Sequence, residues 1–222
     1  FILFILLDEN RNIDLNKAPR ELLAGLFAAL DMDADARAGL PDAIVDWRDS
    51  DTARQLLGAE DPDYLAAGFA YGAKDAPFDT VEELLLLPGM THGIFMQLAP
   101  FLTVDSGQSG IDPTLAPAQV LAALPGMTPD MAHAYRQARQ AFREANRVPP
   151  LPQAIDGRYV TNGRGVIYSI FSSATLERGG TAAIETTVRI QRNRPDMPIA
   201  IQRWSEIDSL DPETAEKGTD ED

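Results

Sequence analysis

The chain has 222 residues, of which 45% are hydrophobic and 24% charged, and it contains no cysteine. This is ordinary globular composition, and the length suits one large domain or two modest ones. The lack of cysteine excludes disulfides, thiolate metal sites and cysteine nucleophiles. Acidic residues outnumber basic ones 34 to 19, which gives a formal net charge of -15 and a pI near 4.4. Nucleic-acid binding draws most of its affinity from lysine and arginine, so this charge argues against a nucleic-acid partner.

Residues 1–16 predict the first strands of a sheet. "FILFILL" at 1–7 is apolar but far shorter than the roughly 20 residues that a membrane-spanning helix needs. With the polar "DENRN" and the following "IDLN", it predicts a β-hairpin. The chain begins with Phe1 instead of methionine, so we expect a fragment whose signal or membrane segment lies upstream.

Residues 17–105 predict the first part of a helical domain, and residues 106–148 a second helical repeat. "KAPRELLAGLFAAL" carries Pro19 in its first turn and leucines at helical spacing. "GLPDAIVDWRDSD" predicts a second helix. "DTVEELLLLPG" predicts another, with Glu82 and Glu83 placed to favour the helix dipole. The segment 115–146 supplies the last two helices.

Residues 149–207 predict the remaining strands of the sheet. After "VPPLPQ", a linker, the chain alternates like two strands around Gly179-Gly180, and "IAIQRWSEI" supplies a third. Residues 208–222 are acidic and poor in apolar residues, which predicts a disordered tail. The pattern as a whole indicates an α+β fold in which a helical domain is inserted between the strands of one sheet.

An internal repeat runs through the helical part. "NIDLNKAPRELLAGLFAAL" at 12–30 aligns with "GIDPTLAPAQVLAALPGM" at 110–127, and "LPGMT" occurs at 87–91 and again at 124–128. Proline and glycine there end one helix and start a tight turn, as in a helix-hairpin-helix unit. We interpret these hairpins chiefly as packing units.

A nucleic-acid-binding module of the competence type is the alternative hypothesis, because helix-hairpin-helix units often grip a phosphate backbone. The two turns, "PGMTHG" and "PGMTPD", contain no lysine or arginine. The basic cluster consists of Arg136, Arg139, Arg143 and Arg147, which share one helix face. A solvated face is the simpler interpretation of that cluster.

Catalytic motifs are lacking. His92 and His133 are the only histidines, and neither belongs to a His-Glu-x-x-His motif. The sequence also lacks a Gly-x-Ser-x-Gly elbow, a P-loop and a dinucleotide-binding fingerprint. A hydrolase that used the acidic loop described next would lose its activity on mutation of Glu60, but no substrate pocket supports that hypothesis.

An acidic loop lies at 46–64, "DWRDSDTARQLLGAEDPDY". Its carboxylates are Asp46, Asp49, Asp51, Glu60, Asp61 and Asp63. Calcium takes six to eight hard oxygen ligands, but the spacing is not that of an EF-hand. From the residues alone, a solvated loop is favoured over a metal site. Trp47 and Tyr64 are expected to anchor the ends of the loop by burial.

Five motifs occur in one order: "DENRNIDLNKAP", "AIVDWRDSD", "GAEDPDY", "VEELLLLPGMT" and "LAPFLTV". In this order the chain resembles, over about residues 8–205, the general secretion pathway protein K family. That family is the large minor pseudopilin of the bacterial type II secretion system. The resemblance implies a pilin-like fold with an antiparallel sheet. A domain of helix-hairpin-helix or SAM-like repeats is inserted between its strands, and an N-terminal pilin helix is missing.

The resemblance also implies a function. The protein would be a non-enzymatic cap of the pseudopilus tip that helps to initiate assembly, for export of folded proteins from the periplasm. Its partners would be the I-type and J-type minor pseudopilins and also the major pseudopilin, with no nucleic acid and no obligate homo-oligomer. A periplasmic domain would be anchored in the inner membrane through the missing helix. Calcium would be held by Asp49, Asp51, Glu60, Asp61 and Asp63.

Overall fold

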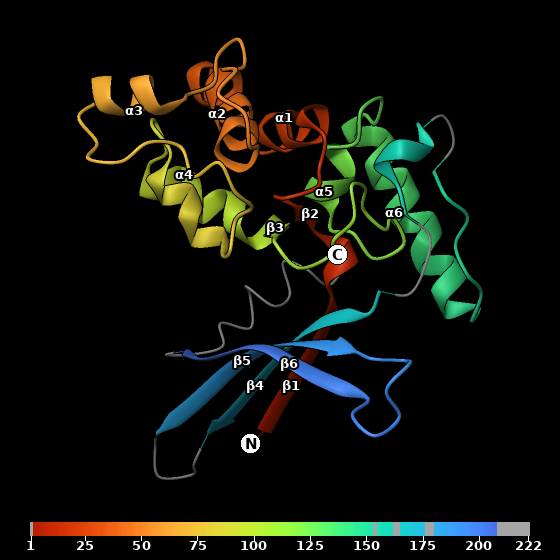
Figure 1. The fold of residues 1–222 in the computed structure, drawn as a ribbon. Helices are drawn as coiled ribbons and strands as arrows, with labels where there is room; N and C mark the ends of the chain where they lie inside the picture. The colour runs from red at the N-terminus through yellow and green to blue at the C-terminus, as the bar shows by residue number, and fades with distance from the viewer. Residues whose placement is uncertain (1, 153–154, 162–164, 176–179, 208–222) are drawn as a thin grey trace.

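The computed structural model of the chain describes residues 2–152, 155–161, 165–175 and 180–207. A twisted four-stranded antiparallel sheet lies beneath a larger helical domain (Figure 1). The sheet order is β1-β4-β5-β6, with bounds Ile2–Asp8, Ile167–Thr175, Thr181–Ile190 and Ile199–Ile207. The predicted α+β class with an antiparallel sheet is confirmed. The predicted Gly179-Gly180 turn falls partly, and the 208–222 tail wholly, outside the described residues.

Strand β1 pairs with β4 along its whole length, from Ile2 opposite Ala174 to Asp8 opposite Tyr168. Residues 9–166 therefore lie between two strands that are neighbours in the sheet. The predicted hairpin within 1–16 is wrong. Instead of turning back, the chain forms a short 3-10 helix, η1 (Glu9–Arg11), because the Asp8 carboxylate accepts the backbone N–H of Asn10.

The second predicted strand, β2 (Ile13–Asp14), does not join the main sheet. It pairs in parallel with β3 (Leu102–Thr103) in a separate two-stranded sheet inside the helical domain. Ile13 is fully buried there, so this strand belongs to the core of the helical domain. The apolar sequence "FILFILL" thus belongs to the main sheet, whereas the mixed sequence "IDLN" belongs to the helical domain.

The helical domain holds the main hydrophobic core. Its helices are α1 (Arg20–Ala29), α2 (Ala34–Arg48), α3 (Asp61–Ala66), η2 (Val81–Leu86), α4 (His92–Leu98), η3 (Ala99–Phe101), α5 (Ala118–Ala122), α6 (Pro129–Glu144) and η4 (Gly157–Tyr159). The helix predicted over 79–87 is a 3-10 helix, η2, whose side chains alternate between core and solvent. The helix ends before Pro88, which cannot continue it.

The two aligned segments of the sequence fold in the same way before their helices. Asp14 and Asp112 each accept the backbone N–H two residues ahead, at 2.8 Å in both cases. Their main-chain oxygens accept the N–H groups of Ala18 and Ala116, at 2.8 and 2.9 Å. In each copy an aspartate therefore fixes the turn that leads into the Ala-Pro start of a helix.

The two "LPGMT" turns are also alike. Gly89 and Gly126 adopt the left-handed backbone region, with φ of 81° and 88°, which favours glycine. Thr91 and Thr128 then cap α4 and α6, each accepting the N–H three residues ahead at 3.2 Å. These contacts end one helix and start the next without any ligand.

The repeated helices α1 and α5 pack against each other at matching positions. Gly25 of the first copy lies against Ala123 of the second. A Cβ atom placed on Gly25 would lie 2.0 Å from the main-chain oxygen of Ala123, so only a hydrogen fits. This contact sets how closely the two halves of the helical domain approach each other.

Candidate functional site

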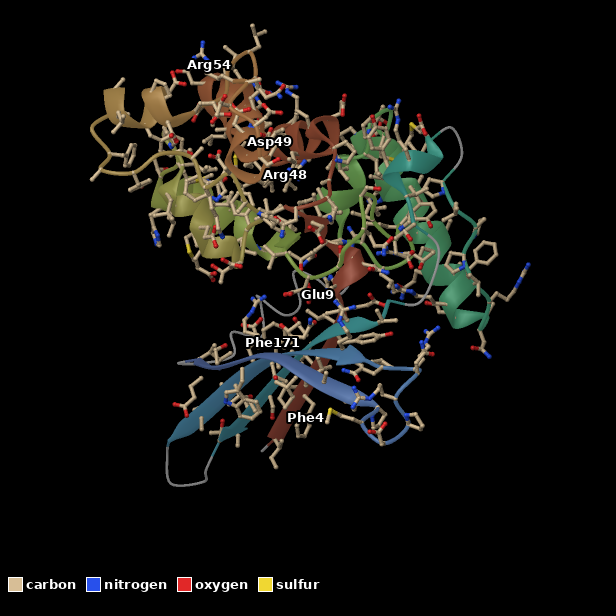
Figure 2. All side chains as sticks on the ribbon, viewed as in Figure 1. Phe4, Glu9, Arg48, Asp49, Arg54 and Phe171 are labelled. Carbon is tan, nitrogen blue, oxygen red and sulfur yellow. The ribbon has the colours of Figure 1, made fainter. Side chains whose placement is uncertain are left out.

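The acidic loop lies at the end of the helical domain farthest from the sheet (Figure 2). It connects the C-terminus of α2, which Asp49 caps, to the N-terminus of α3. Trp47 and Tyr64 at its two ends are 3% and 0% exposed, and their ring centroids lie 5.8 Å apart. The predicted anchoring of the loop by burial is confirmed.

Two carboxylates of the loop are buried. Asp46 is fully buried and accepts the backbone N–H of Gln55 at 3.1 Å. Glu60 is 4% exposed, and its Oε1 atom has no hydrogen-bond partner among the described residues. Burial raises the pKa of Asp46 to about 6, with the charge of Asp49 adding to the shift. Burial also raises the pKa of Glu60 to about 7, and the charges of Asp46, Asp75 and Asp49 add to it. These carboxylates repel one another at neutral pH.

Four of the predicted ligands accept backbone N–H groups, and Asp49 accepts that of Asp51 at 3.4 Å. Asp51 accepts the N–H of Ala53 at 2.8 Å, and Asp61 accepts the N–H of Ala73 at 3.0 Å. Asp63 accepts the N–H of Glu60 at 3.0 Å in a capping box. Its other oxygen lies 3.3 Å from the Arg54 guanidinium.

The predicted ligands therefore divide into two groups. Asp49 and Glu60 belong to an inner acidic cluster, which also contains Asp46 and Asp75. Asp75 was missed because it lies outside the acidic loop, in "AKDAP", where nothing in the sequence distinguishes it from a turn residue. The structure brings it close because the chain returns over the loop after α3, with Asp75 at a positive φ of 53°.

The inner acidic cluster suits a hard divalent cation by its chemistry, since an unpaired buried carboxylate oxygen needs a positive partner. Within the described residues, however, no three His, Asp or Glu side chains converge closely enough to hold a metal ion as they stand. The carboxylates would have to move closer together to hold an ion. Calcium binding stays a prediction.

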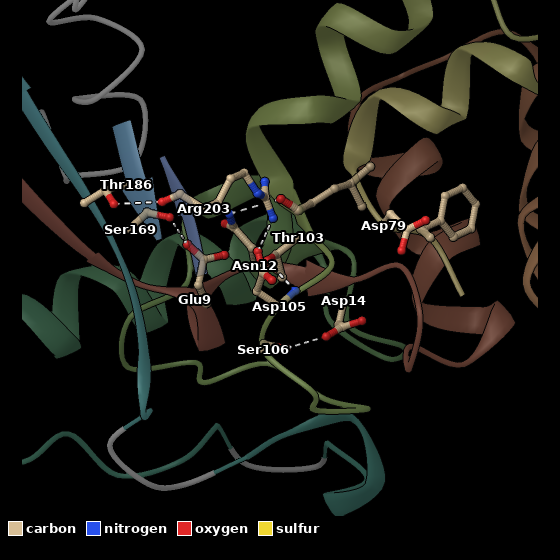
Figure 3. Close-up of polar contacts among 12 residues, drawn as sticks. Glu9, Asn12, Asp14, Asp79, Thr103, Asp105, Ser106, Ser169, Thr186 and Arg203 are labelled. Carbon is tan, nitrogen blue, oxygen red and sulfur yellow. Dashed lines mark hydrogen bonds and ion pairs between the residues drawn. The ribbon is translucent and has the colours of Figure 1, made fainter. Parts of the chain in front are cut away.

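A second polar group of residues joins the sheet to the helical domain (Figure 3). Buried Glu9 accepts the hydroxyl of Ser169 on β4 at 2.6 Å. Arg203 on β6 pairs with Asp105, which follows β3, at 2.5 Å. They line a cavity of about 210 Å³, and burial raises the pKa of Glu9. These contacts fix the helical domain over one face of the sheet.

The opposite face of the sheet is apolar and exposed, and Figure 2 shows Phe4 on that side, while Phe171 points towards the helical domain. Its large exposed side chains are Ile2, Phe4, Leu6, Ile199, Ile201 and Trp204, which are between 56% and 70% exposed. The register places Leu6, Ile170, Thr186 and Trp204 in one row across all four strands. So large an apolar surface marks a binding face.

The arginines of α6 do not form a uniformly solvated face. Arg139 is 2% exposed and donates from Nη1 to the oxygens of Pro113 and Ala116, at 2.9 and 2.7 Å. Arg143 donates to the oxygen of Thr114 at 2.5 Å. The interpretation as a solvated face is wrong for Arg139, whose charge is used inside the fold.

No helix in the described ranges of the chain is both long and apolar enough to cross a bilayer.

Comparison with known proteins shows that the chain is similar to members of one family. Residues 5–106 match the model of the family described as Type II secretion system (T2SS), protein K. A Type II secretion system protein K from Pseudomonas aeruginosa is 35% identical over 115 residues, which is 51% of this chain and 34% of that protein. The namesake from Klebsiella pneumoniae is 33% identical over 84 residues, covering 38% of this chain and 26% of that protein. The matched segments thus span about a third or less of these relatives.

The fold has a counterpart among solved structures. It resembles a chain in the crystal structure of the GspK-GspI-GspJ complex from the enterotoxigenic Escherichia coli type 2 secretion system, with a TM-score of 0.68. The similarity covers 94% of this chain and 80% of that chain at 17% sequence identity. The arrangement of sheet and helical domain is therefore shared well beyond the part matched by sequence.

Proposed function

We propose that this chain is a member of the type II secretion system protein K family and serves as a non-enzymatic minor pseudopilin. The observation that carries the proposal is the pairing of β1 with β4. It places a whole helical domain between two neighbouring strands and leaves the far face of the sheet apolar and open.

The open apolar face suits the helix of a pilin-like fold. A helix laid across the sheet would cover the exposed side chains of β1 and β6, which include Phe4 and Trp204. Burying large side chains of this kind contributes about 1.5–3 kcal/mol each. We assign this helix to a part of the protein outside the chain described here. Extended into the inner membrane, it would anchor a periplasmic domain.

The helical domain suits the tip of a filament. It is larger than the sheet and lies to one side of it, and this bulk would hinder the stacking of a further subunit there (Figure 1). This supports a role in capping the pseudopilus and in starting its assembly for protein export. The I-type and J-type minor pseudopilins are the proposed partners, since the similar solved chain was crystallised in a complex with GspI and GspJ.

The test is co-purification. The periplasmic domains of this protein and of the I- and J-type pseudopilins from the same operon should elute as one complex from size exclusion. Omitting the I-type domain tells whether the J-type domain binds directly. Separate elution of all three at high concentration would contradict the proposed role.

Calcium is the proposed ligand of the inner acidic cluster. Asp49 and Glu60 would hold the ion with Asp46 and Asp75, and the ion would neutralise carboxylates that otherwise repel each other. Asp51 and Asp61 each hold a backbone N–H with one oxygen and would contribute through the other, whereas Asp63 would have to release Arg54 to contribute. Their main effect would be to hold the loop in place.

We propose that the repeated hairpins are helix-hairpin-helix units used for packing, not for nucleic acid. Arg139, in the basic cluster of α6, is bound to main-chain oxygens. A gel shift with duplex DNA is expected to show no salt-sensitive binding, whereas a phosphate-binding module would lose affinity steeply with added salt.

A further inference from the structure

A groove of about 420 Å³ opens on the helical domain, separate from the sheet and from the polar junction. One side is α2 and the other is the turn that contains Gly89 together with the start of α4. Residues 57–59 of the acidic loop form a third side.

The floor of the groove is apolar. Ala36, Leu40 and Ala43 follow one another along α2 and are between 4% and 6% exposed. Ile94 of α4 adds a further apolar side chain. Apolar side chains of a partner could therefore pack against this floor.

One wall of the groove carries an exposed leucine. Leu57 lines the groove and is 52% exposed, and its neighbour Leu56 is 86% exposed. Leaving a leucine in water is unfavourable compared with burying it. An exposed leucine in the wall of an apolar groove is typical of a surface that is covered by a partner.

The charged residues that line the groove are all acidic: Asp33, Asp35 and Asp63. Asp33 and Asp35 also favour the dipole of α2, and Asp33 accepts the N–H of Ala36 at 2.8 Å. Asp63 is balanced in part by Arg54, through an exposed contact of 3.3 Å. The charge of the groove is therefore complementary to a cation.

We propose that this groove binds an extended segment of a partner protein that combines leucine-like side chains with lysine or arginine. The apolar side chains would lie on the floor formed by α2, against Leu57. The basic side chain would reach the carboxylate of Asp35. Neither this surface nor its partner depends on the pseudopilin role, since both follow from the shape and charge of the groove.

The probe is a capped peptide of sequence Lys-Leu-Ala-Leu-Lys, titrated into the ¹⁵N-labelled chain and followed by NMR. Amide shifts are expected within 33–43, 57–63 and 88–94. Replacing the leucines by alanine, or the lysines by glutamate, should abolish them. These two peptides separate groove binding from general attraction to a chain of net charge -15.

Matched variants test the residues. Leu57→Asn should weaken binding about tenfold, because it removes the burial of one leucine. Leu65→Asn changes a leucine of α3 that is 62% exposed and does not line the groove, so it should leave the affinity unchanged. Asp35→Asn should weaken binding, whereas Asp130→Asn, in the first turn of α6, should not.

Three outcomes would overturn the proposal. The shifts could spread over the surface, the two leucine variants could bind alike, or the groove signals could change with protein concentration in the absence of peptide. The last result would identify a second copy of the chain as the occupant. Far-UV circular dichroism of each variant confirms that it is folded.

Discussion

Arg48 on α2 and Arg139 on α6 occupy equivalent places in the two halves of the helical domain. Arg48 donates to the main-chain oxygens of Leu15 and Ala18. Arg139 donates to those of Pro113 and Ala116, which are the aligned positions of the second copy. In both halves, a guanidinium on the later helix binds the turn that starts the earlier one. Burial lowers the pKa of Arg48, and the nearby charges of Asp14 and Asp49 oppose that shift.

Removing either guanidinium should destabilise the domain. Arg139→Met leaves two main-chain oxygens without their donor, and each unsatisfied buried group costs about 1–3 kcal/mol. Urea unfolding should show this loss as a lower midpoint with an unchanged slope. Arg194→Met is the control, because the Arg194 ion pair with Asp196 is exposed. Equal midpoints for the two variants would show that Arg139 has no structural role.

Gly25→Ala should destabilise the contact between the two repeats. The added methyl group would meet the main-chain oxygen of Ala123, which cannot move without shifting α5. Overpacking of this kind costs about 1–3 kcal/mol, occasionally more. Gly157→Ala is the matched control, since a Cβ atom there meets nothing within 4 Å. Thermal unfolding of the two variants gives the comparison, and a stable Gly25→Ala chain would mean that the helices can move apart.

Without calcium, the chain should lose stability as the pH rises from about 4 to about 7. Asp46 and Glu60 have ordinary pKa values of 3.8 and 4.5, and the fold raises them to about 6 and about 7. A group with a raised pKa binds its proton more tightly in the folded state. Its stabilising contribution is therefore complete below the ordinary value and is lost as the pH passes through the raised one. Urea unfolding in chelator at several pH values measures this loss.

Glu60→Gln should remove much of that pH dependence, because an amide does not ionise. Asp130→Asn, on the exposed first turn of α6, is the control and should leave the profile unchanged. A profile that is the same in Glu60→Gln and in the unmodified chain would place the titrating group elsewhere.

Calcium should restore the stability that ionisation removes. The ion binds deprotonated carboxylates, so the difference in melting temperature between calcium and chelator should grow from pH 5 to pH 7. Asp75→Asn should abolish the difference if Asp75 is a ligand. Asp51→Asn, which mainly affects the loop backbone, should reduce it less. No shift at millimolar calcium at pH 7 would contradict the proposed site.

The sequence predicted the class of the fold and the repeated turns because these depend on local chemistry. The two "LPGMT" turns need a glycine at positive φ and a threonine cap, and both residues can be recognised in the sequence. The burial of Trp47 and Tyr64 followed from their size and apolar character. The existence of a helical block between strands followed from the change of periodicity along the chain.

Long-range partners could not be predicted in the same way. "FILFILL" and "IDLN" look like a hairpin, yet each finds its partner far along the chain, in β4 and in β3. Arg139 looks like one of several surface arginines, since its two acceptors are main-chain oxygens of another segment. Asp75 joins the acidic cluster only because the chain folds back after α3.

The pairing of β1 with β4 has a consequence for how the chain folds. Gly165 donates its N–H to the Asp8 carboxylate at 3.0 Å, across a separation of 157 residues. In an unfolded chain, bringing two such distant segments together carries a large cost in loop entropy. The helical domain contains many shorter-range contacts, and once it is compact it holds both of its ends close together. The helical domain should therefore form first and act as the turn of a very long hairpin, on which β1 and β4 then meet.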